Sequence, residues 1–171
     1  PNGTAHYSDG STTDLQDRDY IKKALSGENT VSDVIVSKVT GETVLMYAMP
    51  IEKGGKVVGV LTGRSDANSL SEITKDMTYG KEGYAYMIDN QGSVIAHHDE
   101  EKVINRFNPI KEVQQDESLK ALATIFEEML AKKEGIGTYF FEGQDLYTAY
   151  TPIEGTDWTF AMIANQEEVL S

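Results

Sequence analysis

Two arginines and two tyrosines are the side chains of this sequence best suited to hold a small anion. Arg18 opens an expected helix, where a guanidinium beside the free helix N–H groups suits a carboxylate or a similar anion. Arg64 falls near the end of an expected strand, while Tyr20 and Tyr47 could stack on a ligand. Each has a structural alternative: an ion pair of Arg18 with a nearby aspartate, a solvated strand end for Arg64, and packing on a sheet for the tyrosines.

The other polar clusters do not predict catalysis or metal binding. His97, His98, Asp99 and Glu100 look like a metal cluster, but neighbouring side chains of a strand point to opposite faces, so we expect a plain strand end. The sequence has no Gly-x-Ser-x-Gly, no His-Glu-x-x-His and no glycine-rich phosphate loop. It therefore predicts a protein that is not an enzyme and that needs no metal and no cofactor.

Composition narrows the classes of partner. The 171 residues carry a formal net charge of −13, which argues against nucleic acid and against an anionic membrane surface. Cysteine is absent, so disulfides and thiol catalysis are excluded. No apolar run approaches the roughly 20 residues of a membrane span. Pro1-Asn2-Gly3 resembles the middle of a turn, so we expect the chain to be a piece of a longer protein.

The first half of the sequence predicts a helix followed by an antiparallel meander. Asp14 or Asp17 could cap the helix, and Gly27 suits its C-terminal end. β-Branched residues and glycine turns then indicate three strands, and a second helix follows. The expected elements are a helix over 18–26, strands over 30–39, 43–49 and 56–64, and a helix over 69–77.

The second half begins after an expected linker over 78–83. A hairpin turn at Asn90-Gln91-Gly92 joins two strands, and an amphipathic helix runs from a cap at Asp116 to about Lys133. The remaining expected elements are strands over 83–89, 93–97, 137–141, 146–151 and 158–164, and the start of a helix at Gln166.

A weak internal repeat links the halves. Residues 41–64 lie over residues 143–166 without a gap, sharing a glycine and the tripeptide Pro-Ile-Glu. Proline lacks the N–H that a strand ladder needs, so Pro50 and Pro152 are expected at strand ends. The repeat predicts an α+β fold of two PAS-like lobes with antiparallel sheets.

The same repeat sets the expected lobe boundaries. Asn2-Gly3 aligns with Gln91-Gly92, which would place the opening strand of the first lobe before residue 1. We therefore expect an incomplete, membrane-distal lobe over 1–77 and a complete, membrane-proximal lobe over 78–171.

Several segments together resemble the double-Cache family of extracellular sensor domains, which sit on bacterial chemoreceptors, sensor histidine kinases and diguanylate cyclases. The likeness covers nearly the whole chain and is most specific in the last segment. The segments are Asp17-Arg18-Asp19-Tyr20, Thr40-Gly41-Glu42, Ala48-Met49-Pro50-Ile51, Gly59-Val60-Leu61 and 83–97.

The resemblance implies a ligand site in the first lobe. Family members that sense amino acids hold the ligand carboxylate with an arginine and an aromatic pair, which Arg18 and Tyr20 match and Ile21 does not. Ser37 and Arg64 fall where two aspartates would hold the ammonium. The resemblance thus favours an anion, such as a small carboxylic acid, over an amino acid. The expected ligand-binding residues are Arg18, Tyr20, Ser37, Tyr47 and Arg64.

The function that follows is extracellular sensing of a small molecule as the input domain of a bacterial transmembrane receptor, above all a methyl-accepting chemotaxis protein. The resemblance implies a homodimer, held in the cell membrane by flanking spans. The alternatives are the sensor region of a histidine kinase or diguanylate cyclase, a ligand-free PAS-type dimerisation module, and a small hydrolase.

Overall fold

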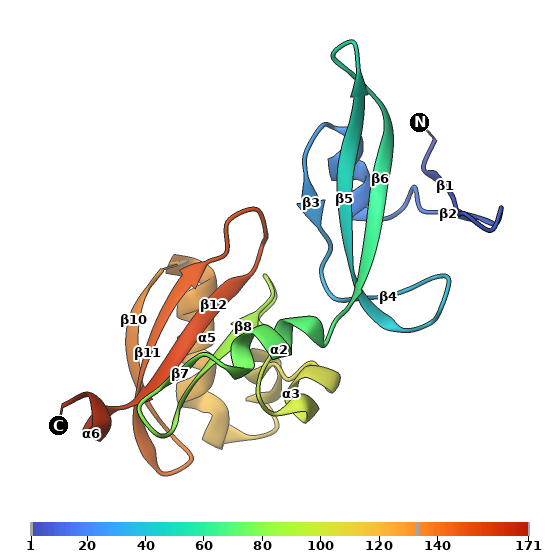
Figure 1. Cartoon of the computed structure of the whole chain (residues 1–171). Coiled ribbons are helices and arrows are strands. Elements are labelled where there is room, and N and C mark those ends of the chain that lie inside the picture. The colour runs from blue at the N-terminus through green and yellow to red at the C-terminus, as the bar shows by residue number, and fades with distance from the viewer. Residues whose placement is uncertain (1, 133, 171) are drawn as a thin grey trace. The chain divides into compact units, whose positions relative to one another are not determined.

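The computed structural model describes residues 2–132 and 134–170, and the chain forms two compact units (Figure 1). Unit 1 spans Pro1–Ala67 and unit 2 spans Asn68–Ser171, each with its own antiparallel sheet. The α+β class with antiparallel sheets is therefore confirmed. The division falls ten residues before the expected boundary, because Leu70 and Thr74 of helix α2 (Ser69–Lys75) are buried within unit 2.

Unit 1 is built around one long hairpin. Strands β5 and β6 pair over their whole length, and β5 also pairs with two short strands. A separate two-stranded hairpin and one short helix complete the unit. The elements are β1 (Thr4–His6), β2 (Thr12–Asp14), α1 (Asp19–Leu25), β3 (Thr30–Val31), β4 (Ile35–Val36), β5 (Thr43–Lys53) and β6 (Lys56–Asp66).

Two strand predictions in unit 1 are wrong for local reasons. The expected strand over 30–39 is broken into β3 and β4, because the Ser32 hydroxyl accepts the N–H of Met46 and takes the place of a backbone acceptor. Pro50 lies inside β5, opposite Val60, and does not end the strand. Proline has no N–H to donate to the strand ladder, and the register of the pairing shifts directly after Ile51.

Unit 2 is a larger sheet with helices around it. Its strand order is β10-β11-β12-β8-β7, and β9 pairs with β8. The short helices α3 and α4 were not predicted, and residue 133, the expected end of the long helix, lies outside the described residues. The elements after α2 are β7 (Thr78–Tyr79), β8 (Gly83–Ile88), β9 (Val94–Ala96), α3 (Glu100–Ile104), α4 (Pro109–Glu112), a 3-10 turn (Glu117–Leu119), α5 (Lys120–Lys132), β10 (Gly135–Phe141), β11 (Gln144–Pro152), β12 (Thr159–Asn165) and α6 (Gln166–Val169).

Strand register corrects the ungapped alignment of the repeat. The two-residue turn between β5 and β6 corresponds to a six-residue loop between β11 and β12. Met46 pairs with Arg64, whereas its repeat partner Thr148 pairs with Ile163. Arg64 therefore corresponds to Ile163 and not to Gln166. The two alignments differ by three residues, and an odd difference matters because it moves every side chain to the other face of the sheet.

The two hydrophobic cores differ in size. In unit 2, α5 lies along one face of the sheet (Figure 1), and its Phe126 ring stacks on Tyr86 with centroids 5.7 Å apart. In unit 1 the buried cluster is small, with Tyr20 and Ile21 of α1 set against Ala48 of β5. Within residues 2–132 and 134–170, no helix combines the length and apolar character that crossing a membrane requires.

Candidate functional site

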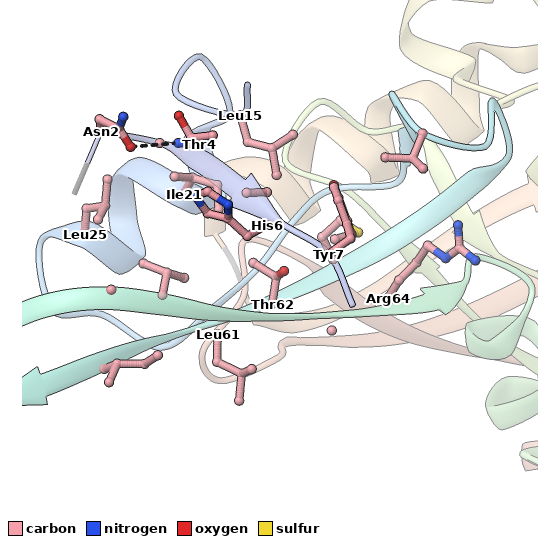
Figure 2. Close-up of a pocket in the computed structure, with 18 of the residues that line it drawn as sticks. Asn2, Thr4, His6, Tyr7, Leu15, Ile21, Leu25, Leu61, Thr62 and Arg64 are labelled. Atoms are coloured by element: carbon pink, nitrogen blue, oxygen red, sulfur yellow. Dashed lines mark hydrogen bonds between the residues drawn. The ribbon is translucent and has the colours of Figure 1, made fainter. Parts of the chain in front are cut away.

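Unit 1 contains a cavity of about 970 Å³ above the face of β6 that α1 and the β1–β2 hairpin cover (Figure 2). This is the size range of small-molecule sites. Its apolar walls come mainly from α1 and the β5–β6 hairpin, and its polar walls come from residues 2–8, the 37–40 turn and β6. The apolar side chains are Ala5, Leu15, Ile21, Leu25, Val39, Met46, Ile51, Val58, Val60 and Leu61; the polar ones are Asn2, Thr4, His6, Tyr7, Ser8, Ser37, Thr40, Thr62 and Arg64.

Among the described residues that line the cavity, Arg64 carries a charge, and no Asp, Glu or Lys is present. Its Nη1 donates to Thr40 Oγ1 at 3.1 Å and lies 3.9 Å from Glu42 Oε2, beyond hydrogen-bond length. The side chain is 45% exposed, so the Glu42 pairing is weak. Arg64 and Thr62 leave β6 on the cavity side, while Leu61 points to the other side (Figure 2).

The turn that carries Ser37 and Thr40 forms one edge of the cavity and is held by internal hydrogen bonds. Ser37 Oγ accepts the N–H groups of Val39 and Thr40, both at 3.2 Å. The Ser37 carbonyl accepts the N–H of Gly41, whose φ of +74° suits glycine. Ser37 therefore lines the cavity and at the same time holds the turn in shape.

Arg18 and Tyr20 are not among the residues that line the cavity. Arg18 precedes α1, and its Nη2 donates to the Val36 carbonyl at 3.1 Å, one residue from Ser37. Its Nε is buried and has no hydrogen-bond partner among the described residues. Tyr20 is 5% exposed in the core, and burial raises the pKa of its hydroxyl.

Three sequence-based assignments around this site are resolved by geometry. Arg18 itself occupies the N-cap position of α1 and makes no side-chain cap bond, so neither Asp14 nor Asp17 is the cap. Asp17 pairs with Lys38 at 2.8 Å and not with Arg18. Tyr47 is opposite Gly63 on the face of β5 away from the cavity and is 43% exposed.

Sequence reasoning missed the hairpin that covers the cavity. His6 and Tyr7 line it from the end of β1. The available signal was Asp9-Gly10, a dipeptide typical of hairpin turns, with Gly10 at a φ of +84°. Gly3 is also required, because a Cβ at this residue would lie 2.5 Å from the Cβ of Gln16.

Unit 2 has smaller spaces at the corresponding face, one of them of about 100 Å³ beside Tyr84 and Ile163. A space of about 20 Å³, roughly the room that one water needs, lies between Tyr86, His97, Phe126 and Tyr139. Burial raises the pKa of Tyr84 at its edge to about 12. Both spaces are far smaller than the cavity of unit 1.

His97 and His98 do not alternate across a strand, which corrects the reasoning applied to them. Strand β9 ends at Ala96, and the two imidazole rings stack with centroids 4.3 Å apart. His97 Nδ1 accepts the N–H of Asp99, and burial lowers the pKa of His97 to about 3. Among the described residues no group of three potential ligands is arranged for a metal ion. That this segment binds no metal stays a prediction.

The segment most specific for the resemblance has a structural role. Asp89 is buried, accepts the N–H groups of Gln91 and Ser93, and pairs with Arg106 Nη2 at 2.6 Å. Asn108 donates to the Gln91 carbonyl at 2.9 Å. These bonds fix the β8–β9 turn, so the motif stabilises the unit and does not line the cavity.

Two antiparallel-sheet units follow one another along the chain, the first with a cavity and the second with a packed core, which is a PAS-like arrangement. The family model for the Cache domain matches residues 1–171. The chain belongs to the Cache domain family.

Similar proteins include bacterial chemoreceptors. The methyl-accepting chemotaxis protein PctB of Pseudomonas aeruginosa is 23% identical over 150 residues, which are 84% of this chain and 21% of that receptor. PscA of Pseudomonas syringae pv. tomato is 22% identical over 158 residues, 90% of this chain and 23% of the receptor. The chain thus spans about a fifth of the length of these curated relatives.

Solved sensor domains share the fold. The ligand-binding domain of the Pseudomonas fluorescens chemoreceptor CtaA, in complex with L-leucine, has a TM-score of 0.66 at 19% identity, covering 98% of this chain and 72% of that one. The extracellular domain of the putative histidine kinase mmHK1S-Z3 has a TM-score of 0.68 at 19% identity, covering 94% and 59%. These likenesses show the fold.

Proposed function

We propose that this chain is the extracellular, non-catalytic input domain of a bacterial chemoreceptor, and that it binds a small molecule in the cavity of unit 1. The cavity of about 970 Å³ is the observation that carries the proposal. The similarity to chemotaxis receptors supports the receptor class. A membrane-distal position for unit 1, a homodimer and membrane attachment through flanking spans belong to the same proposal.

The cavity provides an apolar compartment with a cation at one end, a combination typical of sites for small organic acids and amino acids. Arg64 and the 37–40 turn supply the polar end. Arg18 adds a second guanidinium behind that turn, with a buried Nε that no described protein atom satisfies. Buried polar atoms are normally paired, so this donor supports an anion or a bridging water nearby.

Signalling would follow from differential affinity. A ligand shifts a receptor between two states only if it binds one state more tightly. The β1–β2 hairpin offers a physical basis for that difference, because its residues line the cavity and would contact a ligand only while the hairpin covers the sheet.

A thermal-unfolding screen of the chain tests the proposal. The panel comprises carboxylic acids, amino acids, amines, nucleosides and sugars at millimolar concentration. A ligand present at 100 times its Kd stabilises the folded state by about 2.7 kcal/mol, which raises the melting temperature by several degrees. If no compound raises the melting temperature, ligand sensing by this domain is wrong and the ligand-free PAS-type module is favoured.

A further inference from the structure

We infer that the unit 1 cavity selects an aliphatic monocarboxylate that carries no ammonium group. This inference rests on the proposed function and concerns the same cavity. It starts from the charge of the walls: the chain has 28 acidic and 15 basic residues, yet the described residues that line the cavity include Arg64 and neither Asp nor Glu. A positive wall in an acidic chain indicates an anionic ligand.

The guanidinium of Arg64 lies at the cavity and has donors available for a carboxylate. Thr40 Oγ1 accepts from Nη1, which leaves most of the five N–H donors of the guanidinium for another partner. Two parallel N–H groups match the two oxygens of a carboxylate. Glu42 Oε2 lies 3.9 Å from Nη1; the side chain of Glu42 is 69% exposed and is not among the residues that line the cavity.

The rest of the cavity suits an alkyl chain. Its apolar lining includes Leu15, Ile21, Leu25, Met46 and Val60. An ammonium placed among these side chains would lose its hydration without a carboxylate to replace it. An alkyl group gains from the same surface, at about fourfold in affinity per buried CH₂.

The experiment is isothermal titration calorimetry of residues 1–171 with three matched probes. They are 4-methylpentanoate, L-leucine, which adds an ammonium to it, and 3-methylbutylamine, which keeps the ammonium and lacks the carboxylate. We expect 4-methylpentanoate to bind at least about tenfold more tightly than L-leucine and the amine not to bind. Arg64→Gln should weaken 4-methylpentanoate binding by about tenfold or more. Tyr47→Ala, on the face of β5 away from the cavity and not among the residues that line it, should leave it unchanged.

Three results would overturn the inference. The first is L-leucine binding as tightly as 4-methylpentanoate, and the second is unchanged binding in Arg64→Gln. In the third, none of the three probes binds while another compound of the thermal screen does. In each of these cases ligand sensing by the domain still stands. Failure of every compound in the screen, these probes included, would instead reject both the inference and the proposed function.

Discussion

The two units use the same sheet face in opposite ways. In unit 2 that face carries Tyr150 and Ile163, both buried, and α5 covers it with Phe126. In unit 1 the corresponding residues are Ala48 and Arg64, and a seven-residue helix with a small hairpin leaves a cavity. Large apolar side chains and a long helix give unit 2 a packed core, whereas small or polar side chains and a short helix leave a cavity in unit 1.

The largest expected effect comes from giving unit 2 the residue of unit 1. Ile163→Arg would replace a buried apolar side chain of the core with a charged one, which should cost about 5 kcal/mol of the free energy of unfolding. The reverse change, Arg64→Ile, replaces an exposed side chain and should alter stability by less than about 0.5 kcal/mol. Urea unfolding of both variants measures the difference, and equal costs would contradict the correspondence of these two positions.

Truncating a core side chain should also destabilise unit 2 more than unit 1. Phe126→Ala removes a fully buried ring and should cost about 4 kcal/mol, whereas Ile21→Ala, at the wall of an existing cavity, should cost about 2 kcal/mol. Trp158, the single tryptophan, is buried in unit 2, so its fluorescence follows unfolding of that unit. Backbone hydrogen exchange reports on unit 1. A larger loss in Ile21→Ala would mean that unit 1 is the more tightly packed.

Acid should weaken unit 2 through His97. Its pKa is about 3 in the folded state, against about 6.5 when unfolded, so between these values the unfolded chain binds the extra proton. Stability is therefore complete above pH 6.5 and falls as the pH drops toward 3, by about 2 kcal/mol between pH 7.5 and pH 5.

The measurement is the free energy of unfolding of His97→Asn as a function of pH, followed by Trp158 fluorescence. The amide oxygen of the introduced side chain can still accept the N–H of Asp99. Lys102, His98 and Asp99 surround the ring, so they remain in both proteins and cancel in the comparison. His6→Gln in unit 1, an exposed histidine, serves as the control. An unchanged slope in His97→Asn would show that His97 titrates normally.

The smallest effect distinguishes a structural from a ligand-binding role for Ser37. Ser37→Ala removes the acceptor of two N–H groups in the 37–40 turn and should cost about 1 kcal/mol of unit 1 stability. Binding of 4-methylpentanoate should fall by less than about threefold. Ser8→Ala, at the same cavity, should change neither quantity. A tenfold loss of affinity without loss of stability would make Ser37 a direct ligand contact.

The sequence predicted the α+β class, most helices and strands, and the family, because glycine turns and apolar periodicity are local signals. It did not predict that Tyr47 lies away from the cavity or that Arg64 corresponds to Ile163. Both depend on strand register, which the length of the β-turn sets and an ungapped alignment cannot show. Ser37 and Arg64 do line the cavity, while Arg18 and Tyr20 lie behind its wall.

The most direct test of the division between the units is a chemical-shift titration of the ¹⁵N- and methyl-labelled chain with 4-methylpentanoate. We predict saturable shifts at Ile21, Leu25 and Val60, with none in the α5 core around Phe126. Shifts centred on His97 and Phe126, or on the outer face at Tyr47, would contradict the assignment of binding to unit 1 and of packing to unit 2.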